Sequence, residues 1–126
     1  MKALVIDDSR AMRVILGGML KQLGFEVADA ENGRVGLDRL RSMEQIDIVL
    51  VDWNMPEMNG YEFLVNMRAE RKYDEVRIMM VTTETEMSQM QKALSSGANE
   101  YVMKPFTREV IQEKLEMLGV VVHQAA

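Results

Sequence analysis

The chain has no cysteine and only one histidine among its 126 residues. Without cysteine it can form neither a disulfide nor a thiolate metal site, and a reducing, cytoplasmic location is therefore expected. The single histidine, His123, lies close to the carboxyl terminus and is interpreted as a solvated residue. A zinc site built from nitrogen and sulfur ligands is consequently not expected.

Long apolar runs are also missing, because no segment approaches the roughly 20 residues of a membrane-spanning helix. The chain begins Met-Lys-Ala-Leu and passes straight into an apolar segment, without the layout of a signal peptide. The formal net charge of −5 disfavours general binding of nucleic acid. We therefore expect neither a membrane nor DNA as a direct partner.

The residues that are present indicate a single domain over residues 1–126, with a poorly defined tail from about residue 119. Hydrophobic residues make up 48% and charged residues 28% of the chain, which is typical of a folded globular protein. No linker or internal repeat is visible. The 13 methionines have two interpretations, adaptable core filler or an adaptable partner surface, and both stay open at this point.

Short apolar runs alternate with segments of helical periodicity along the whole chain. Strands are predicted over residues 3–6, 25–28, 46–51, 76–81 and 101–103. Helices are predicted to begin after the N-capping residues Ser9, Asn32, Asn59, Thr85 or Glu86, and Thr107. The runs are too apolar to face water on either side. The pattern therefore predicts an α/β fold with a parallel sheet covered by helices on both faces.

The apolar positions of the helices predict which sides face the core. The first helix has the widest stripe, formed by Met12, Ile15, Leu16, Met19, Leu20 and Leu23. The second is expected to turn inward Val35, Leu37, Leu40 and Met43. The fourth carries on one side Met87, Met90, Ala93 and Leu94, and the last carries Val110, Ile111, Leu115 and Leu118.

Polar side chains follow four of the predicted strands at the point where each strand ends. They are Asp7 and Asp8, Asp52, Thr82 and Thr83, and Lys104. In open α/β sheets, ligands bind at the carboxyl ends of the strands. Taken singly, each of these features is also typical of a solvated turn, a helix cap or a loop. Their joint occurrence at equivalent strand ends is what indicates a functional site.

The chemistry of this set points to phosphoryl transfer. Three carboxylates held close together repel one another, and a hard divalent cation such as Mg²⁺ relieves that repulsion with oxygen ligands. Asp52 ends the most apolar strand, where a lone charge needs a partner, and a carboxylate can act as a nucleophile that forms an aspartyl phosphate. Lys104 and the cation would neutralise the phosphoryl oxygens, and Thr82 would donate a hydrogen bond to one of them.

Several stretches match a known family over nearly the whole chain. They are Leu4–Ser9, Val51–Pro56 with Asn59-Gly60, Val81-Thr82, Tyr101, and Lys104–Phe106. In these stretches the sequence resembles bacterial response-regulator receiver domains, and the run Trp53–Pro56 is most similar to the stand-alone chemotaxis branch. The resemblance implies a flavodoxin-like, doubly wound, five-stranded parallel sheet in the order 2-1-3-4-5 with five helices.

Carried over by position, the resemblance assigns the phosphoacceptor to Asp52. It implies that Asp8 and Asp52 bind Mg²⁺ directly, that Asp7 binds it mostly through water, and that the backbone carbonyl of Asn54 completes the protein ligands. Lys104 would pair with the phosphoryl group, and the bond between Lys104 and the following proline is expected to be cis.

The resemblance also implies a conformational response. Thr82 and Tyr101 match the family's switch pair, in which the hydroxyl and the aromatic side chain move inward together. Asn54, Thr83 and Glu84 occupy positions that tune the lifetime of the acyl phosphate, and Thr83 is larger than the residue typical of the chemotaxis branch. The expected partner face carries Met87, Met90, Tyr101 and Arg108.

The resulting expectation is a monomeric, single-domain response regulator rather than an enzyme acting on other substrates. A histidine kinase would phosphorylate it, a phosphatase could reset it, and a downstream target such as the flagellar motor switch would bind the phosphorylated form.

Three alternatives stay open at this point. One is a phosphorelay intermediate that passes the phosphoryl group to a histidine phosphotransfer protein. A phosphatase of the haloacid-dehalogenase type would want an acid where Asn54 stands. A flavodoxin-like cofactor binder would meet an acidic edge that repels phosphate.

Overall fold

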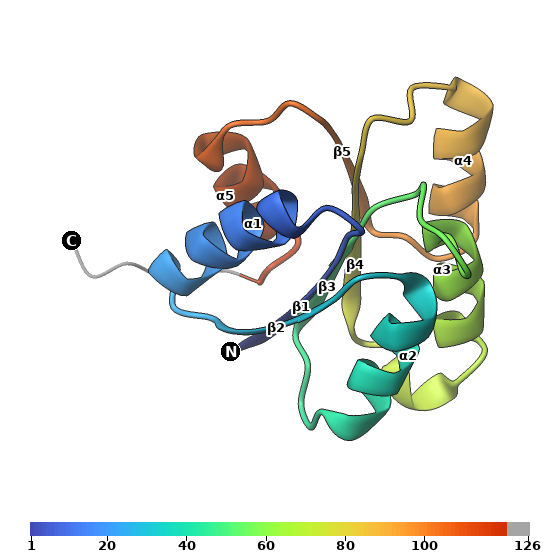
Figure 1. Cartoon of the computed structure of the whole chain (residues 1–126), viewed down its shortest axis with the longest axis horizontal. Coiled ribbons are helices and arrows are strands. Elements are labelled where there is room, and N and C mark those ends of the chain that lie inside the picture. Colours follow the sequence, from blue (N-terminus) through green and yellow to red (C-terminus); the bar gives the residue numbers. More distant parts are fainter. Residues whose placement is uncertain (121–126) are drawn as a thin grey trace.

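The computed structural model describes residues 1–120, and within them strands alternate with helices in a single α/β unit (Figure 1). The strands are β1 (Lys2–Ile6), β2 (Glu26–Ala30), β3 (Ile48–Val51), β4 (Arg77–Thr82) and β5 (Glu100–Met103). The α-helices are α1 (Arg10–Gln22), α2 (Gly33–Ser42), α3 (Gly60–Arg68), α4 (Met87–Ser95) and α5 (Arg108–Met117), with a short 3-10 helix, η1 (Arg71–Tyr73). None of these helices is long and apolar enough to cross a membrane.

The five strands form one parallel sheet in the order β2-β1-β3-β4-β5, which confirms the predicted fold class. Register is continuous through the central strands: Leu4 pairs with Val49, and Val49 pairs with Ile78. Helices α1 and α5 lie together on one face of the sheet, and α2, α3 and α4 cover the other (Figure 1). Each face has its own apolar cluster, and β1, β3 and β4 contribute side chains to both.

Side-chain caps begin four of the helices at the predicted residues. The side chains of Ser9, Asn32 and Thr107 accept hydrogen bonds from the backbone N–H three residues ahead, at 2.9–3.2 Å. Asn59 forms a reciprocal capping box with Glu62. Helix α4 is the exception, because it begins at Met87 after Glu86 without a side-chain cap. The strand bounds differ from prediction by up to two residues.

The core-facing stripes are narrower than predicted. Ile15 on α1 is 47% exposed, whereas Leu16 and Leu20 are buried. Successive residues are rotated by about 100° around a helix, so Ile15 lies at the edge of a side centred on Leu16. For the same reason Leu94 and Val110 are 43% and 37% exposed, beside the buried Ala93 and Ile111.

The ends of three helices account for the remaining differences. Met87 opens α4 and is 70% exposed, which corrects its predicted place on the core side. Met43 lies just beyond the end of α2 but still packs against the core. After the end of α5, the backbone N–H of Val120 donates to the carbonyl of Leu115, and the side chain of Val120 is buried. The chain is therefore packed through residue 120. His123 lies outside the described residues.

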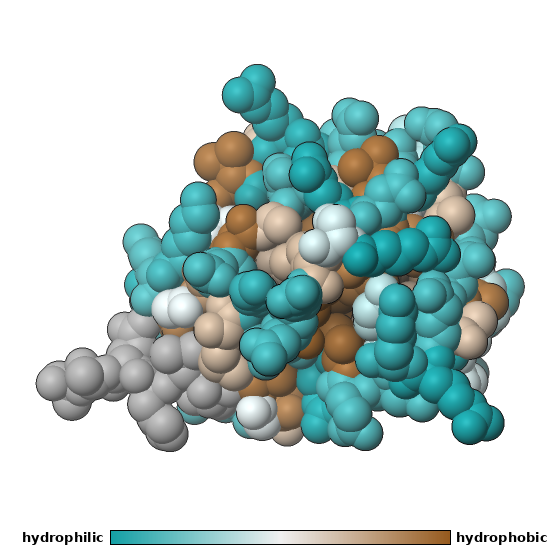
Figure 2. Space-filling view, turned by 90° about the horizontal axis from the view of Figure 1, so that it is seen from below, coloured by the Kyte–Doolittle hydropathy of each residue, from teal (hydrophilic) through white to brown (hydrophobic). Residues whose placement is uncertain are grey.

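The surface between the exposed helix positions is predominantly polar. Seen from below the view of Figure 1, the described surface is mostly hydrophilic, with hydrophobic side chains showing in separate patches (Figure 2). A shallow cavity of about 540 Å³ lies at the amino-terminal ends of β1, β3 and β4. It is lined by charged residues of both signs, including Arg41, Asp47, Lys72 and Arg77. This end of the sheet is opposite to the strand ends singled out by the sequence.

Candidate functional site

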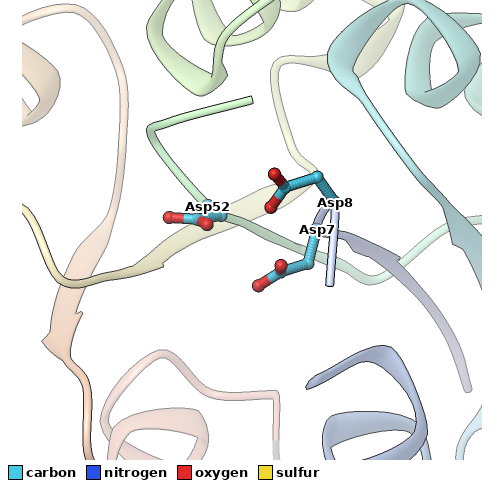
Figure 3. Close-up of side chains that lie close together, drawn as sticks. All are labelled: Asp7, Asp8 and Asp52. Carbon is cyan, nitrogen blue, oxygen red and sulfur yellow. The ribbon is translucent and has the colours of Figure 1, made fainter. Parts of the chain in front are cut away.

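The sheet order brings most of the predicted site residues to one edge. Strands β1, β3, β4 and β5 are consecutive neighbours, so the residues at their carboxyl ends lie side by side. Asp7 and Asp8 follow β1, Asp52 follows β3, Thr82 ends β4 and Lys104 follows β5. Figure 3 shows the three aspartates converging on a common space. Four neighbouring, hydrogen-bonded strands therefore position the residues of the site.

The three carboxylates lie close enough to share one cation. One oxygen from each of Asp7, Asp8 and Asp52 lies within 4.8 Å of the others. Asp7 and Asp52 are buried, at 1% and 8% exposure, and Asp8 is exposed. An all-oxygen donor set at a rim open to water is the environment that a hard cation such as Mg²⁺ prefers.

Lys104 offsets part of this negative charge. Its Nζ donates to Oδ2 of Asp7 at 2.8 Å and to Oδ2 of Asp52 at 3.4 Å. The second oxygen of Asp7 accepts from the N–H of Ser9 at 2.9 Å, and that of Asp52 accepts from the N–H of Trp53 at 2.7 Å. Asp7 is thus held through both oxygens, whereas the exposed Asp8 makes no side-chain hydrogen bond to the described residues.

The electrostatics of the edge follow from burial and crowding. Burial raises the pKa of Asp52, the charge of Asp7 adds to the rise, and the hydroxyl of Thr82 and the charge of Lys104 oppose it. For Lys104, burial alone would lower the pKa, but its hydrogen bond to Asp7 and the charges of both carboxylates outweigh burial and raise it. Lys104 therefore stays protonated, and Asp52 is the carboxylate of the cluster whose charged form is disfavoured.

Thr82 and Tyr101 converge on the same residue. Thr82 is fully buried, and its Oγ1 accepts a hydrogen bond from the N–H of Glu84 at 3.2 Å. The hydroxyl of Tyr101 donates to the carbonyl of Glu84 at 3.0 Å, and Tyr101 is 8% exposed. Burial, with the charges of Glu84 and Asp52, raises the pKa of Tyr101 to about 12. Both the N–H and the carbonyl of Glu84 are thus hydrogen-bonded, which holds the loop after β4. Thr83, between Thr82 and Glu84, is exposed.

Two backbone features shape the loops around the site. The N–H of Gly60 donates to the carbonyl of Trp53, and a Cβ at Gly60 would lie 2.0 Å from the carbonyl oxygen of Asp52. Only glycine fits there, because the backbone after the acidic strand end turns back on itself. The peptide bond between Lys104 and Pro105 is cis, as predicted. Asn54, in the loop after Asp52, is exposed.

Sequence reasoning missed Arg13 and left out the end of the second strand. The guanidinium of Arg13 donates to the backbone carbonyl of Asp7 at 2.7 Å and to the carboxylate of Asp29 at 2.9 Å. It ties the peptide between the first two aspartates to strand β2. The sequence offered only a basic residue at the fourth position of the helix that follows Asp8, which is too common a feature to mark a role.

The predicted partner face is only partly exposed. Met87 projects from α4, whereas Met90 packs against the core and Tyr101 is buried. Arg108, at the start of α5, is half-buried, and its Nε has no hydrogen-bond partner in residues 1–120. Met103, on the edge strand β5, is 37% exposed and was not among the residues predicted for this face.

The fold is an open, doubly wound α/β sheet, and three carboxylates and a lysine lie at its carboxyl edge. These features define the class: an α/β protein with a strand-end site for a cation and an anionic group. The particular family follows from comparison with known proteins. Residues 3–116 match the model of the response regulator receiver domain, and the chain belongs to that family.

Relatives and solved structures agree with this assignment. The chain is 47% identical over 117 residues to a chemotaxis protein CheY homolog of Campylobacter jejuni, covering 92% of this chain and 90% of that protein. It is 42% identical over 119 residues to chemotaxis protein CheY1 of Helicobacter pylori, covering 94% and 96%. The structure of chemotaxis protein CheY4 of Vibrio cholerae superposes with a TM-score of 0.86 at 33% identity, covering 93% of this chain and 97% of that one.

Proposed function

We propose that this chain is a phosphorylation-dependent signalling switch that accepts a phosphoryl group on Asp52. The observation that carries the proposal is the position of this carboxylate. It is 8% exposed, lies within one cluster with two further carboxylates, and has Lys104 at 3.4 Å. Burial raises the pKa of Asp52 and so disfavours its charged form, and conversion to an acyl phosphate moves the negative charge from the carboxyl group to the phosphoryl oxygens.

The residues fit Mg²⁺ as the cofactor. Asp8 has both oxygens available, and the second oxygen of Asp52 meets Lys104 only at the longer distance of 3.4 Å, so these two would hold the ion directly. Asp7 has one oxygen bonded to Ser9 and the other to Lys104, and it would reach the ion through water. The backbone carbonyl of Asn54 would complete the protein ligands. The bound ion would supply charge neutralisation for the phosphoryl oxygens.

The chemical step is a displacement at phosphorus. An oxygen of Asp52 forms the new P–O bond while the P–N bond of a phosphohistidine donor breaks, and the donor, protonated on its other ring nitrogen, leaves as neutral imidazole. Lys104 pairs with one phosphoryl oxygen, and the hydroxyl of Thr82 donates to another. A histidine kinase supplies the phosphoryl group in this proposal, and water attack on the same phosphorus returns Asp52 to its carboxylate.

The response to phosphorylation runs through the loop after β4. In the present arrangement the hydroxyl of Thr82 accepts a hydrogen bond from the N–H of Glu84. Turning this hydroxyl toward a phosphoryl oxygen would change its contact with Glu84, the residue whose carbonyl accepts from Tyr101. The new dianion biases this loop between two packings. Asn54, Thr83 and Glu84 surround the approach of water and set the lifetime of the acyl phosphate.

We place the output in chemotaxis, at a target such as the flagellar motor switch. The support is the set of chemotaxis proteins at 40–47% identity over more than nine-tenths of the chain. The partner face is the surface around Met87, Met90, Tyr101 and Arg108. The chain acts as a cytoplasmic monomer without direct DNA binding, and a phosphatase resets it. The substrate-phosphatase alternative is disfavoured by Asn54, whose amide cannot protonate a leaving group.

Phosphoryl acceptance is tested with a small phosphodonor. Wild-type protein incubated with acetyl phosphate and Mg²⁺ is expected to gain one adduct, cleaved by hydroxylamine and located on Asp52 by peptide mass spectrometry. Asp52→Asn should gain none, and Asp38→Asn, an exposed aspartate on α2, should behave as wild type. An adduct that persists in Asp52→Asn, or its absence from wild type, would refute the proposal.

The partner face is tested by comparing two exposed apolar residues on different helices. Met87 on α4 is 70% exposed and Val14 on α1 is 67% exposed. With beryllofluoride and Mg²⁺ as a stable phosphoryl mimic, binding to a flagellar motor switch protein is measured by calorimetry. Met87→Ala should weaken binding about tenfold and Val14→Ala should leave it unchanged. Equal losses in the two variants would move the interface elsewhere.

A further inference from the structure

The loop after Asp52 is tied to the beginning of α2 by a buried side chain. Asn32, the N-cap of α2, is 3% exposed. Its Oδ1 accepts from the N–H of Val35 at 2.9 Å, and its Nδ2 donates to Oε2 of Glu57 at 3.1 Å. Within residues 1–120 this is the only side-chain hydrogen bond that links loop residues 53–58 to another element.

The same loop is held in an unusual backbone conformation. Glu57 has φ +64°, in the left-handed region that non-glycine residues rarely adopt. The next residue, Met58, accepts a backbone hydrogen bond from Gly33 at 3.0 Å, and a Cβ at Gly33 would lie 2.7 Å from that carbonyl oxygen. A strained residue persists only where its surroundings hold it, and here Asn32 and Gly33 of α2 do so together.

We infer that Asn32 and Glu57 are positioning residues for the cation site, an inference that rests on the proposed function. Their hydrogen bond holds the loop between Asp52 and Gly60, and that loop contains Asn54, whose backbone carbonyl is one of the ligands in the proposed function. Neither side chain is itself a proposed ligand. Outer contacts of this kind typically change metal affinity about tenfold or more when they are lost.

Glycine at position 57 separates this role from general stability. Glu57→Gly removes the hydrogen bond but suits the left-handed backbone, so the loop gains freedom without new strain. We expect the Kd for Mg²⁺ to rise about tenfold while the midpoint of chemical unfolding without Mg²⁺ stays the same or increases. The matched control is Gln45→Gly, at the other non-glycine residue with positive φ within residues 1–120, +57°, which precedes β3 at the opposite end of the sheet. It should leave Mg²⁺ affinity unchanged.

Exchange of the hydrogen-bonding groups provides the rescue. Glu57→Gln keeps an acceptor for Asn32 and should bind Mg²⁺ within about twofold of wild type. Asn32→Asp places two carboxylates against each other and should weaken binding about tenfold or more. In the double variant Asn32→Asp with Glu57→Gln, donor and acceptor change places while the N-cap is kept, and affinity should recover.

The readouts are the fluorescence of Trp53 during Mg²⁺ titration, calorimetry, and the rate of adduct formation from acetyl phosphate. Trp53 is the only tryptophan and follows the acceptor aspartate directly. If wild type neither binds Mg²⁺ nor gains an adduct, the proposed function itself is wrong. If wild type does both and Glu57→Gly equals it in Kd and rate, only the positioning role is overturned. A Kd that worsens only in proportion to lost stability, without recovery in the double variant, also overturns it.

Discussion

Two half-buried cationic side chains lie at opposite ends of the sheet strands and have different surroundings. Lys104, at the carboxyl edge, faces the carboxylates of Asp7 and Asp52. Arg68, at the end of α3 beside the amino-terminal ends of β4 and β5, donates only to neutral oxygens. They are the backbone carbonyls of Gly97, Tyr73, Asp74 and Val76 and the side-chain oxygen of Asn99, at 2.7–3.5 Å.

The difference separates a structural site from a chemical one. The planar guanidinium of Arg68 is saturated by fixed dipoles, and it joins the end of α3 to residues 73–76 and to residues 97–99. Burial lowers the pKa of Arg68, so burial disfavours the charge of this side chain, and its hydrogen bonds serve to join backbone segments. At the other edge one ammonium contacts two of three clustered carboxylates, so negative charge is left unbalanced. An edge with unbalanced negative charge is ready to take up a cation.

The largest expected effect on stability is at Arg68. Arg68→Met leaves several inward-facing carbonyls without donors and should lower the free energy of unfolding by about 3 kcal/mol. Chemical denaturation monitored by circular dichroism measures it. Arg71→Met, at an exposed arginine in η1, is the control and should change stability little. If Arg68→Met folds, its Mg²⁺ affinity should equal that of wild type, and a large loss of affinity would contradict the separation of the two edges.

Removal of the other cation should cost less and depend on Mg²⁺. Lys104→Met leaves two buried carboxylates unpaired and should lower the free energy of unfolding by about 2 kcal/mol in chelator. Added Mg²⁺ should recover much of this loss, because the ion replaces the missing positive charge. Lys21→Met, on the exposed side of α1, should show neither effect. A loss in Lys104→Met that Mg²⁺ leaves unchanged would mean that the lysine serves packing alone.

Asp52→Asn should have the opposite sign. Because burial raises the pKa of Asp52 above its ordinary value, the folded state holds this proton more tightly than the unfolded state. Its carboxylate therefore destabilises the fold as pH rises through the window between the ordinary and the raised pKa. In chelator near neutral pH, Asp52→Asn should gain about 1 kcal/mol, and the gain should shrink as pH falls toward the ordinary pKa.

Thermal unfolding across pH measures this gain, with Asp38→Asn as the control at an exposed position. A loss of stability in Asp52→Asn near neutral pH would show that Lys104 already compensates the buried charge.

An effect as small as that at Asp52 is expected at Tyr101. Tyr101→Phe removes the hydrogen bond to the carbonyl of Glu84 and should cost about 1 kcal/mol. Since the pKa of Tyr101 is raised to about 12, the hydroxyl remains a donor and the difference should be constant from neutral pH to about pH 10. Urea denaturation at several pH values tests this. Tyr73→Phe is the control, because the hydroxyl of Tyr73 makes no hydrogen bond to residues 1–120.

The elements of the fold could be predicted because local signals were strong. Ser9, Asn32, Asn59 and Thr107 cap the helices that follow them, and apolar runs became buried strands. Where the stripe of a helix has an edge, as at Ile15, periodicity does not say how wide the covering surface is. Helix α4 begins without a side-chain cap, and the exposure of Met87 depends on which elements pack beside it.

Within the candidate site, the sequence predicted the residues at strand ends but missed the hydrogen bonds that hold the surrounding loops in place. The aspartates and Lys104 could be found because strand ends are readable from apolar runs. Arg13 and the hydrogen bond between Asn32 and Glu57 join segments 6 to 25 residues apart, and no local pattern marks them. The positive φ of Glu57 is likewise a result of packing against α2, since no glycine or asparagine marks that position.

The sequence by itself determined the alternation of strands and helices, the chemical character of the strand ends and, through its motifs, the family. These depend on residue type and on spacing within one element, which are local properties. Only the tertiary structure decided that Lys104 lies 2.8 Å from Asp7, that Asp8 is the free carboxylate and that Glu57 bonds to Asn32. Such contacts exist because the order of parallel strands brings distant ends of the chain to one edge, and neighbours across a sheet are set by the packing of the whole domain.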